Sequence, residues 1–245
     1  TNYLQRYSEH YHEKLALAGN GGNTNGSIHD IVLTKEEGLQ DKLFIDGYRR
    51  HGLIDHVFDS SQSQDLHYRG NLQENLAIQS SQVQQDEAGV QIISIGKIDT
   101  SQIQIEKKVE LHHNNLSVKI KISNTGETTI DQLYGLEMNF GLLGGDSPDR
   151  YYQVNGKPVG SLNSHGEHGD VQNVSLINEW DNFKINMDFG EECQLWRSPI
   201  ETISMSEAGF ERVYQASALM PHWKLKLNPG ESLELGLLLN INKFK

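Results

Sequence analysis

The sequence predicts an all-β protein, a large antiparallel β-sandwich preceded by a short helix. Three observations support this fold class: apolar and polar residues alternate in many short stretches from Ser27 onward, turn-forming residues separate the stretches, and no helical period is interleaved between them. Parallel strands need crossover helices, so their absence favours antiparallel pairing. With 245 residues, the chain is long enough to bury a core of its own.

The first 18 residues are predicted to form one helix. Apolar side chains recur there at steps of three or four and form a single stripe: Leu4, Tyr7, Tyr11, Leu15 and Ala18. Residues 19–26 (GNGGNTNG) consist mainly of glycine and asparagine, which favour turn conformations. We therefore expect a linker over 19–26 and the sandwich domain over 27–245.

The strands follow from the period of two. Residues 103–111 and 116–122 alternate clearly and predict a hairpin joined by 112–115, and the same alternation occurs at 183–189 and 233–241. Further strands are predicted at 28–34, 42–45, 48–58, 76–84, 90–95, 130–140, 174–180, 210–220 and 222–227. Glycine-rich stretches at 141–145 and 160–169 predict loops.

Charge and cysteine content narrow the function classes. The 33 acidic residues outnumber the 21 basic ones and give a formal charge of −12, which argues against nucleic acid and anionic membranes as partners. Cys193 is the single cysteine, so an intrachain disulfide and a cysteine-based zinc site are excluded, and a cytoplasmic location is expected. No apolar run reaches the length of a membrane span, and the start at Thr1 suggests a piece of a longer polypeptide.

Residues 48–58 (YRRHGLIDHVF) form the densest cluster of functional groups. Alternation along a strand places Arg50 and His56 on one face, and Arg49, His51 and Asp55 on the other. Both faces are mixed, which favours a polar cleft or a domain interface. Arginine with aspartate can bind a sugar hydroxyl or form an internal ion pair, and the sequence leaves both open.

Two further places carry candidate carbohydrate-binding or interface residues. Trp180 is followed by Asp181 and Asn182 in a turn-like sequence that can expose the indole ring as a stacking platform for a sugar, although core packing is the usual role of tryptophan. Glu137 alternates with apolar neighbours in LYGLEMNF and faces either a concave sheet surface or solvent.

One cluster offers potential metal ligands: His165, Glu167, His168 and Asp170. Two imidazoles and two carboxylates suit a borderline metal, but a flexible glycine-rich loop does not preorganise them and the HExxH pattern is absent. We expect a solvated polar loop and no bound metal or cofactor. Local signatures of a nucleophile elbow, a phosphate loop or a dinucleotide site are also absent.

Two long phrases, IHDIVLTKEEGLQDKLFIDGYRRHGLIDHVF and LYGLEMNFGLLGGDSPDRYY, resemble the C-terminal β-sandwich region of glycoside hydrolase family 57, which contains α-amylases and 4-α-glucanotransferases. The resemblance covers most of 27–245, and residues 3–18 are similar to the last helix of the helical region before that sandwich. It implies a sandwich like that of galactose mutarotase. It also implies that the catalytic glutamate and aspartate lie on a preceding barrel, to which nothing in this chain corresponds.

The resemblance therefore implies a noncatalytic accessory domain of an α-1,4-glucan-active enzyme, without catalytic residues of its own. Its expected partners are the catalytic barrel of the same polypeptide and an α-glucan or maltooligosaccharide. Two alternatives stay open: a carbohydrate-binding module, which needs exposed aromatic side chains along a groove, and a stand-alone mutarotase-like sugar isomerase, which needs paired titratable groups in a concave pocket.

Overall fold

The computed structural model describes residues 4–19 and 33–244. The helical elements are α1 (His12–Gly19), the 3-10 helix η2 (Leu39–Lys42) and α2 (Gln64–Arg69). The strands are β1 (Ile54–Phe58), β2 (Leu76–Gln85), β3 (Gly89–Ile98), β4 (Ser101–His112), β5 (Asn115–Asn124), β6 (Ile130–Phe140), β7 (Arg150–Val154), β8 (Lys157–Ser161), β9 (Gly166–Asn178), β10 (Phe183–Ser206), β11 (Gly209–Leu227) and β12 (Ser232–Lys243).

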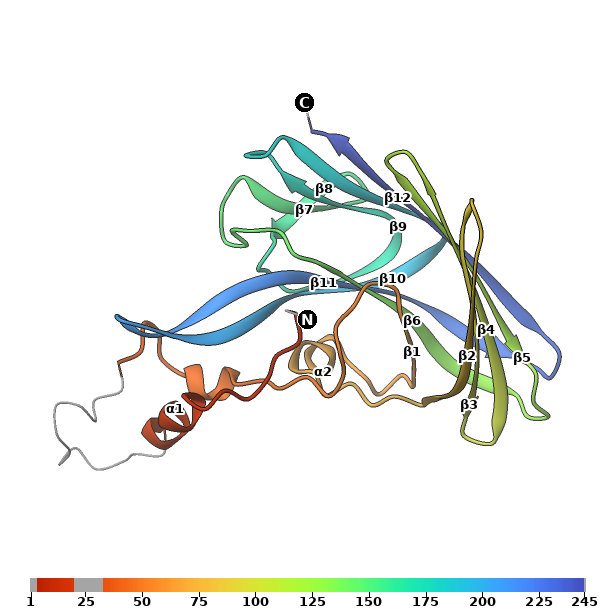
Figure 1. The fold of residues 1–245 in the computed structure, drawn as a ribbon, viewed down its shortest axis with the longest axis horizontal. Coiled ribbons are helices and arrows are strands. Elements are labelled where there is room, and N and C mark those ends of the chain that lie inside the picture. Colours follow the sequence, from red (N-terminus) through yellow and green to blue (C-terminus); the bar gives the residue numbers. More distant parts are fainter. Residues whose placement is uncertain (1–3, 20–32, 245) are drawn as a thin grey trace.

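Within the described part of the chain these strands form one antiparallel sheet. Its main order is β1-β6-β11-β10-β12-β5-β4-β3-β2, while β9 pairs with β10 and β7, and β7 pairs with β8. The sheet curves back on itself, so that β2 to β5 and β12 form a layer at a steep angle to β6, β10 and β11 (Figure 1). The predicted all-β antiparallel sandwich is confirmed.

The long strand β10 joins the layers. Its first part, 183–189, pairs with β12, and its second part, 194–206, pairs with β11. Between them, Gly190 lies against Gly236 of β12, where an added Cβ would be 3.5 Å from the backbone of Gly236. Because the two parts of β10 belong to different layers, the inner faces of both layers enclose one apolar core, which includes Ile105, Val118, Tyr134, Leu176 and Leu219.

The predicted hairpin at 103–122 is confirmed. β4 and β5 pair with Ile105 opposite Ile122 and Val109 opposite Val118, both consistent with the alternation in the sequence. The connecting turn is tighter than predicted, since His112 and Asn115 already pair. His113 adopts a positive φ of 53° there, a conformation that a two-residue hairpin turn requires.

Several predicted elements differ from the structure. The helix expected over 1–18 begins only at His12, and 42–45 and 48–53 lie outside strands, because the segment before β1 crosses a sheet face and makes side-chain contacts instead of pairing. Residues 166–169 belong to β9, and 210–227 form a single strand. Helix α2 and the β7–β8 pair were not predicted. Residues 20–32 lie outside the described residues and include most of the predicted linker and of the strand at 28–34.

The segments before β2 cover one face of the sheet. In Figure 1, α1 and α2 lie on one side of β10 and β11, and β7 to β9 lie on the other. Two small apolar clusters fix this cover, one joining α1 to β10 and β11 and one joining β1 to β10 and β11: Leu15, Leu39, Ile203 and Phe210 in the first, and Phe58, Trp196 and Met220 in the second. Among the residues that the structure describes, no helix combines the length and the apolar character needed to cross a membrane.

Candidate functional site

Glu137 lies at the centre of a buried polar cluster between β6 and the segments that cover it. Alternation along β6 directs Leu136 and Met138 into the main core and turns Glu137 to the opposite face. That face is covered by α2 and by the chain before β1, so the side chain of Glu137 is fully buried. Of the two expected environments, solvent is excluded, and the sheet face to which Glu137 points is covered by these segments.

Five side chains donate hydrogen bonds to the Glu137 carboxylate. Oε1 accepts from Arg50 Nη1 at 3.1 Å and from Asn139 Nδ2 at 2.7 Å. Oε2 accepts from the Tyr48 hydroxyl at 2.6 Å, His56 Nε2 at 3.0 Å and His67 Nε2 at 2.9 Å. Together these bonds satisfy the acceptor capacity of both oxygens.

Four parts of the chain supply the donors: the segment before β1 with Tyr48 and Arg50, β1 with His56, α2 with His67, and β6 itself with Asn139. His56 lies on β1 opposite Gly135 of β6, two residues from Glu137 on the same face. A Cβ at position 135 would lie 2.7 Å from Met220 Sδ and 3.0 Å from the Phe58 ring, so glycine is needed for this packing. His67 lies on α2, a short helix whose N-terminus is capped by Ser63 Oγ, which accepts from Leu66 N at 3.3 Å.

The cluster extends to the N-terminal segment through Asp46. Arg50 Nε donates to Asp46 Oδ1 at 3.0 Å, and Arg6 donates to both carboxylate oxygens, through Nε at 3.0 Å and Nη2 at 2.6 Å. Arg6 and Arg50 are almost completely buried. The carboxylates of Asp46 and Glu137 therefore tie residue 6, the segment before β1 and β6 together.

The electrostatics separate the two histidines. Burial disfavours the charge on His56, but its hydrogen bonds to Glu137 and Glu74 outweigh burial and raise its pKa to about 9. For His67, burial dominates over the attraction of Glu137 and lowers the pKa. At neutral pH, His56 is protonated and donates from both nitrogens, whereas His67 is neutral and donates only from Nε2.

The carboxylates of the cluster stay ionised. Burial opposes the charge of Glu137, but Arg50 and the two histidines hold its pKa well below the ordinary value. Likewise, Arg6 and Arg50 overcome the burial of Asp46 and lower its pKa. With its partners at hydrogen-bond distance and no exposed surface, Glu137 is suited to holding the fold together and not to taking a proton from a substrate.

The predicted alternation over 48–58 holds only in part, because 48–53 lies outside β1. Arg50 and His56 join Glu137, whereas Asp55 faces the main core, where it accepts from the Tyr134 hydroxyl at 2.6 Å and pairs with Lys107 at 2.8 Å. Arg49 and His51 are exposed and lie outside the cluster. Of the two open interpretations, the geometry favours the internal ion pair over a sugar contact for Arg50.

Trp180 is exposed, as its turn-like sequence suggested. It lies between β9 and β10 with 78% of its surface accessible, while Trp196 and Trp223 are buried. Asp181 is fixed by Asn178, whose Nδ2 donates to Asp181 Oδ2 at 2.8 Å and whose Oδ1 accepts from the Asp181 amide. Asn182 accepts from the Phe244 amide through its carbonyl oxygen.

The histidines near residue 165 have other partners. His168 Nε2 accepts from Arg197 Nε at 3.0 Å, and His165 Nδ1 contacts Gln64 Nε2 at 3.1 Å. Glu167 and Asp170 lie exposed on β9. Across residues 4–19 and 33–244, no three His, Cys, Asp or Glu side chains come together in a way that could hold a metal ion.

Sequence reasoning missed several members of the cluster: Asp46, Tyr48, His67 and Glu74. Tyr48 lies in the segment that the sequence marked as dense in polar groups, and this density was the only available signal. His67 comes from α2, which has six residues and no long apolar period to reveal it.

Comparisons with known proteins identify the family of this chain. The sequence profile of the family described as "Alpha-amylase/4-alpha-glucanotransferase, C-terminal" matches residues 1–237. Alpha-amylase 1 of Dictyoglomus thermophilum is 30% identical over 95% of this chain and 34% of its own length, and the alpha-amylase of Pyrococcus abyssi is 26% identical over 86% of this chain and 30% of its own length. The chain thus spans about a third of these relatives.

Solved structures support the fold. The 4-alpha-glucanotransferase of Thermococcus litoralis superposes with a TM-score of 0.65 at 18% identity, covering 86% of this chain and 32% of that protein. A candidate aldose 1-epimerase of Escherichia coli K12 superposes with a TM-score of 0.53 at 13% identity, covering 71% of this chain and 70% of that protein. The second match reflects the mutarotase-like sandwich alone. By the match over 1–237, this chain belongs to the alpha-amylase/4-alpha-glucanotransferase C-terminal family.

Proposed function

We propose that this chain is the noncatalytic accessory domain of an α-1,4-glucan-active enzyme of glycoside hydrolase family 57, acting in the cytoplasm. The observation that carries the proposal is the family match over nearly the whole chain, combined with coverage of only about a third of the relatives. The single cysteine, Cys193, is free and buried, and a chain without disulfides is typical of the reducing cytoplasm.

The geometry of the Glu137 cluster supports a structural role. A retaining glycosidase needs two carboxyl groups roughly 5 to 5.5 Å apart on either side of the bond that is cleaved, with access for substrate. Glu137 and Asp46 are buried, and arginines and histidines occupy their oxygens. The partner that we propose for this domain is the catalytic barrel of the same polypeptide.

A stand-alone sugar isomerase is less well supported. The structure does bring two histidines to one carboxylate, which is the kind of paired set that such an enzyme requires. The exposed fractions of Glu137, His56 and His67 are 0%, 2% and 1%, so a sugar cannot reach them without displacing α2 or the segment before β1. This burial favours the accessory domain.

Glucan contact is a second candidate function, favoured by Trp180. Exposed tryptophan is uncommon on a protein surface, and its ring face can pack on the C–H bonds of a pyranose. On the neighbouring strand β7, the Tyr151 hydroxyl donates to Glu179 Oε1 at 3.0 Å, so a second ring and a carboxylate lie near this turn. We propose that a maltooligosaccharide contacts the protein at Trp180.

The decisive experiment measures activity with and without the region that precedes this chain. The purified chain and the polypeptide encoded upstream of Thr1 are prepared separately and mixed, and reducing ends and chain-length redistribution are followed with maltoheptaose. We expect no turnover by the chain alone, and association of the two pieces on size exclusion. Turnover by this chain that disappears on replacement of one of its own carboxylates would reject the accessory-domain proposal.

A further inference from the structure

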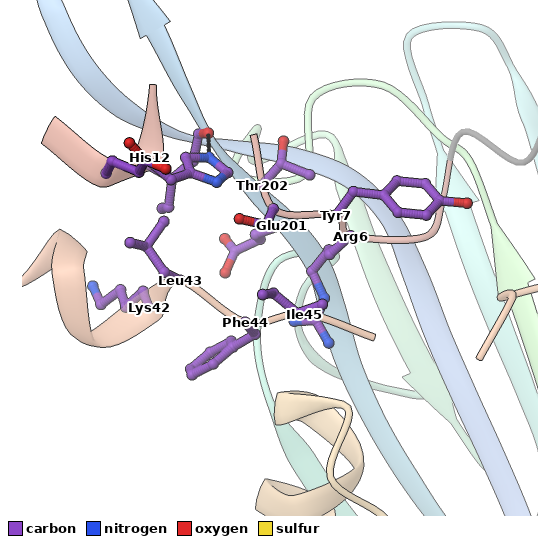
Figure 2. A pocket seen from close by; sticks show the side chains of 12 residues that line it. Arg6, Tyr7, His12, Lys42, Leu43, Phe44, Ile45, Glu201 and Thr202 are labelled. Atoms are coloured by element: carbon purple, nitrogen blue, oxygen red, sulfur yellow. Dashed lines mark hydrogen bonds between the residues drawn. The ribbon is translucent and has the colours of Figure 1, made fainter. Parts of the chain in front are cut away.

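A pocket of about 200 Å³ lies on the covered side of the molecule, apart from the turn that carries Trp180. Three segments that are distant in sequence form it: 6–13 before and at the start of α1, 42–45 after η2, and 201–203 of β10. Figure 2 shows side chains from all three segments around one space. A register shift between Ile200 and Glu201 in the pairing with β11 marks the point where β10 enters the pocket.

Glu201 provides a carboxylate with one free oxygen. Its Oε2 accepts from the Tyr68 hydroxyl at 3.1 Å and from Arg212 Nη1 at 3.3 Å. In the described part of the chain no group donates to Oε1, and that atom is not enclosed by protein. Figure 2 shows the carboxylate directed into the space between Leu43 and Ile45.

Arg6 forms part of the wall beside Glu201. It lines the pocket with 2% of its surface exposed, and its Nε and Nη2 are occupied by Asp46 and the Tyr68 carbonyl. Its Nη1 is buried and has no hydrogen-bond partner. Because this atom is enclosed by protein, it stays out of reach of an occupant, and Arg6 contributes to the wall of the pocket but supplies no donor.

The lining favours a neutral occupant over an ion. The lining carries two basic residues, Arg6 and Lys42, and two acidic residues, Glu13 and Glu201, so its formal charges cancel. His12 is also committed: its Nδ1 accepts from the Glu9 amide at 3.0 Å, which leaves Nε2 to donate to the Ile203 carbonyl at 2.8 Å.

The remaining lining is mixed. Leu43, Ile45 and Ile203 are aliphatic, Tyr7 and Phe44 are aromatic, and Ser8 and Thr202 carry hydroxyls. A free carboxylate oxygen, lining hydroxyls and an apolar wall together match a small neutral molecule with several hydroxyls and an apolar C–H face. The volume is smaller than that of a typical drug-sized ligand site and suits a single sugar ring.

We propose that this pocket binds one glucosyl unit of an α-glucan as a noncatalytic surface site. The proposal rests on the proposed function for the substrate class, and it adds a second, independent place of sugar contact. Glu201 is not one of a pair of catalytic carboxylates. The site therefore holds the polymer near the enzyme without reacting with it.

The test is a titration of the ¹⁵N-labelled chain with maltotriose followed by backbone amide shifts. We expect saturable shifts at 43–45 and 201–203, with a dissociation constant of about 1 mM. Glu201→Gln keeps the shape of the side chain but removes the carboxylate, and should weaken binding at least fivefold. The matched control, Glu211→Gln, lies on β11 outside the pocket and should bind as the unchanged protein does.

Ile45→Ser provides a second test that does not endanger folding, because Ile45 is already 56% exposed. It should also weaken binding severalfold by removing part of the aliphatic wall. Shifts confined to 179–182, or none at millimolar maltotriose, would overturn the proposal while leaving association with the upstream region unaffected. Amide protection of 43–45 by that region, without sugar binding, would instead identify the pocket as a domain contact and also overturn it.

Discussion

Arg50 Nη1 donates a hydrogen bond to Glu137 Oε1 at 3.1 Å, and both side chains are at least 99% buried. The two residues are 87 positions apart. Arg50 belongs to the segment before β1, and Glu137 to β6 in the middle of the sheet. This pair fixes the covering segment on the sheet, and it links the N-terminal third of the chain to the sandwich.

Glu137→Gln should destabilise the domain strongly. The substitution leaves Arg50 and His56 buried next to a neutral amide, and loss of one partner of a buried ion pair costs about 3 to 5 kcal/mol. Urea denaturation followed by tryptophan fluorescence measures the change. Asp131→Asn is the matched control, because its pair with Lys226 is more than half exposed and should contribute less than about 1 kcal/mol. Equal effects of the two variants would contradict a central role for Glu137.

Stability should depend on pH through His56 and His67. His56 has a pKa raised to about 9, so its contribution is complete below pH 6.5 and is lost as the pH rises towards 9. His67 has a lowered pKa, so its contribution is present above pH 6.5 and declines as the pH falls, when the unfolded chain takes up a proton first. The midpoint temperature of thermal unfolding should therefore be highest near pH 6.5.

The His56→Gln variant isolates one arm of this pH profile. Its unfolding temperature should change less between pH 6.5 and 9 than that of the unchanged protein, since the titrating imidazole is gone. For a shift of this size the full effect is about 3 kcal/mol at most. A decline between pH 6.5 and 9 that is identical in both proteins would show that other groups produce it.

Trp180→Ala should leave stability nearly unchanged and weaken glucan binding. The ring is 78% exposed, so its removal should alter the free energy of unfolding by less than about 0.5 kcal/mol. Calorimetric titration with maltoheptaose should show a severalfold loss of affinity. Leu143→Ala removes an even more exposed apolar side chain without a ring, and should leave the affinity as it was. If both variants bind alike, Trp180 is not a sugar platform.

Metal removal should have no effect on folding. His168 already accepts from Arg197, and His165 contacts Gln64, so neither imidazole is oriented towards a shared ligand position. Dialysis against a chelator should leave the thermal midpoint within error, and elemental analysis should find no stoichiometric zinc. One equivalent of zinc that persists after dialysis, and disappears in His165→Ala, would contradict this.

The alternation of apolar residues along the chain predicted the class of fold and much of the strand pairing. At 103–122 the period of two identifies both the hairpin and its inward face, because local spacing alone decides which side chains lie on one side of a strand. The same rule places His56 and Asp55 on opposite faces of β1. It could not reveal α2, whose six residues are held by a serine cap and by tertiary contacts.

What covers each face of a strand is decided only by tertiary structure. The sequence placed Glu137 opposite the core side of β6, but it is buried by residues 46–53, which pair with no strand, together with β1 and α2. The exposure of Trp180 followed from its turn, a local feature, whereas the burial of Arg50 and the pocket beside Glu201 depend on distant segments meeting. Periodicity is a property of neighbours in sequence, while burial and charge pairing depend on how distant parts pack, and this is why the sequence determined the sandwich and only the folded chain decided its sites.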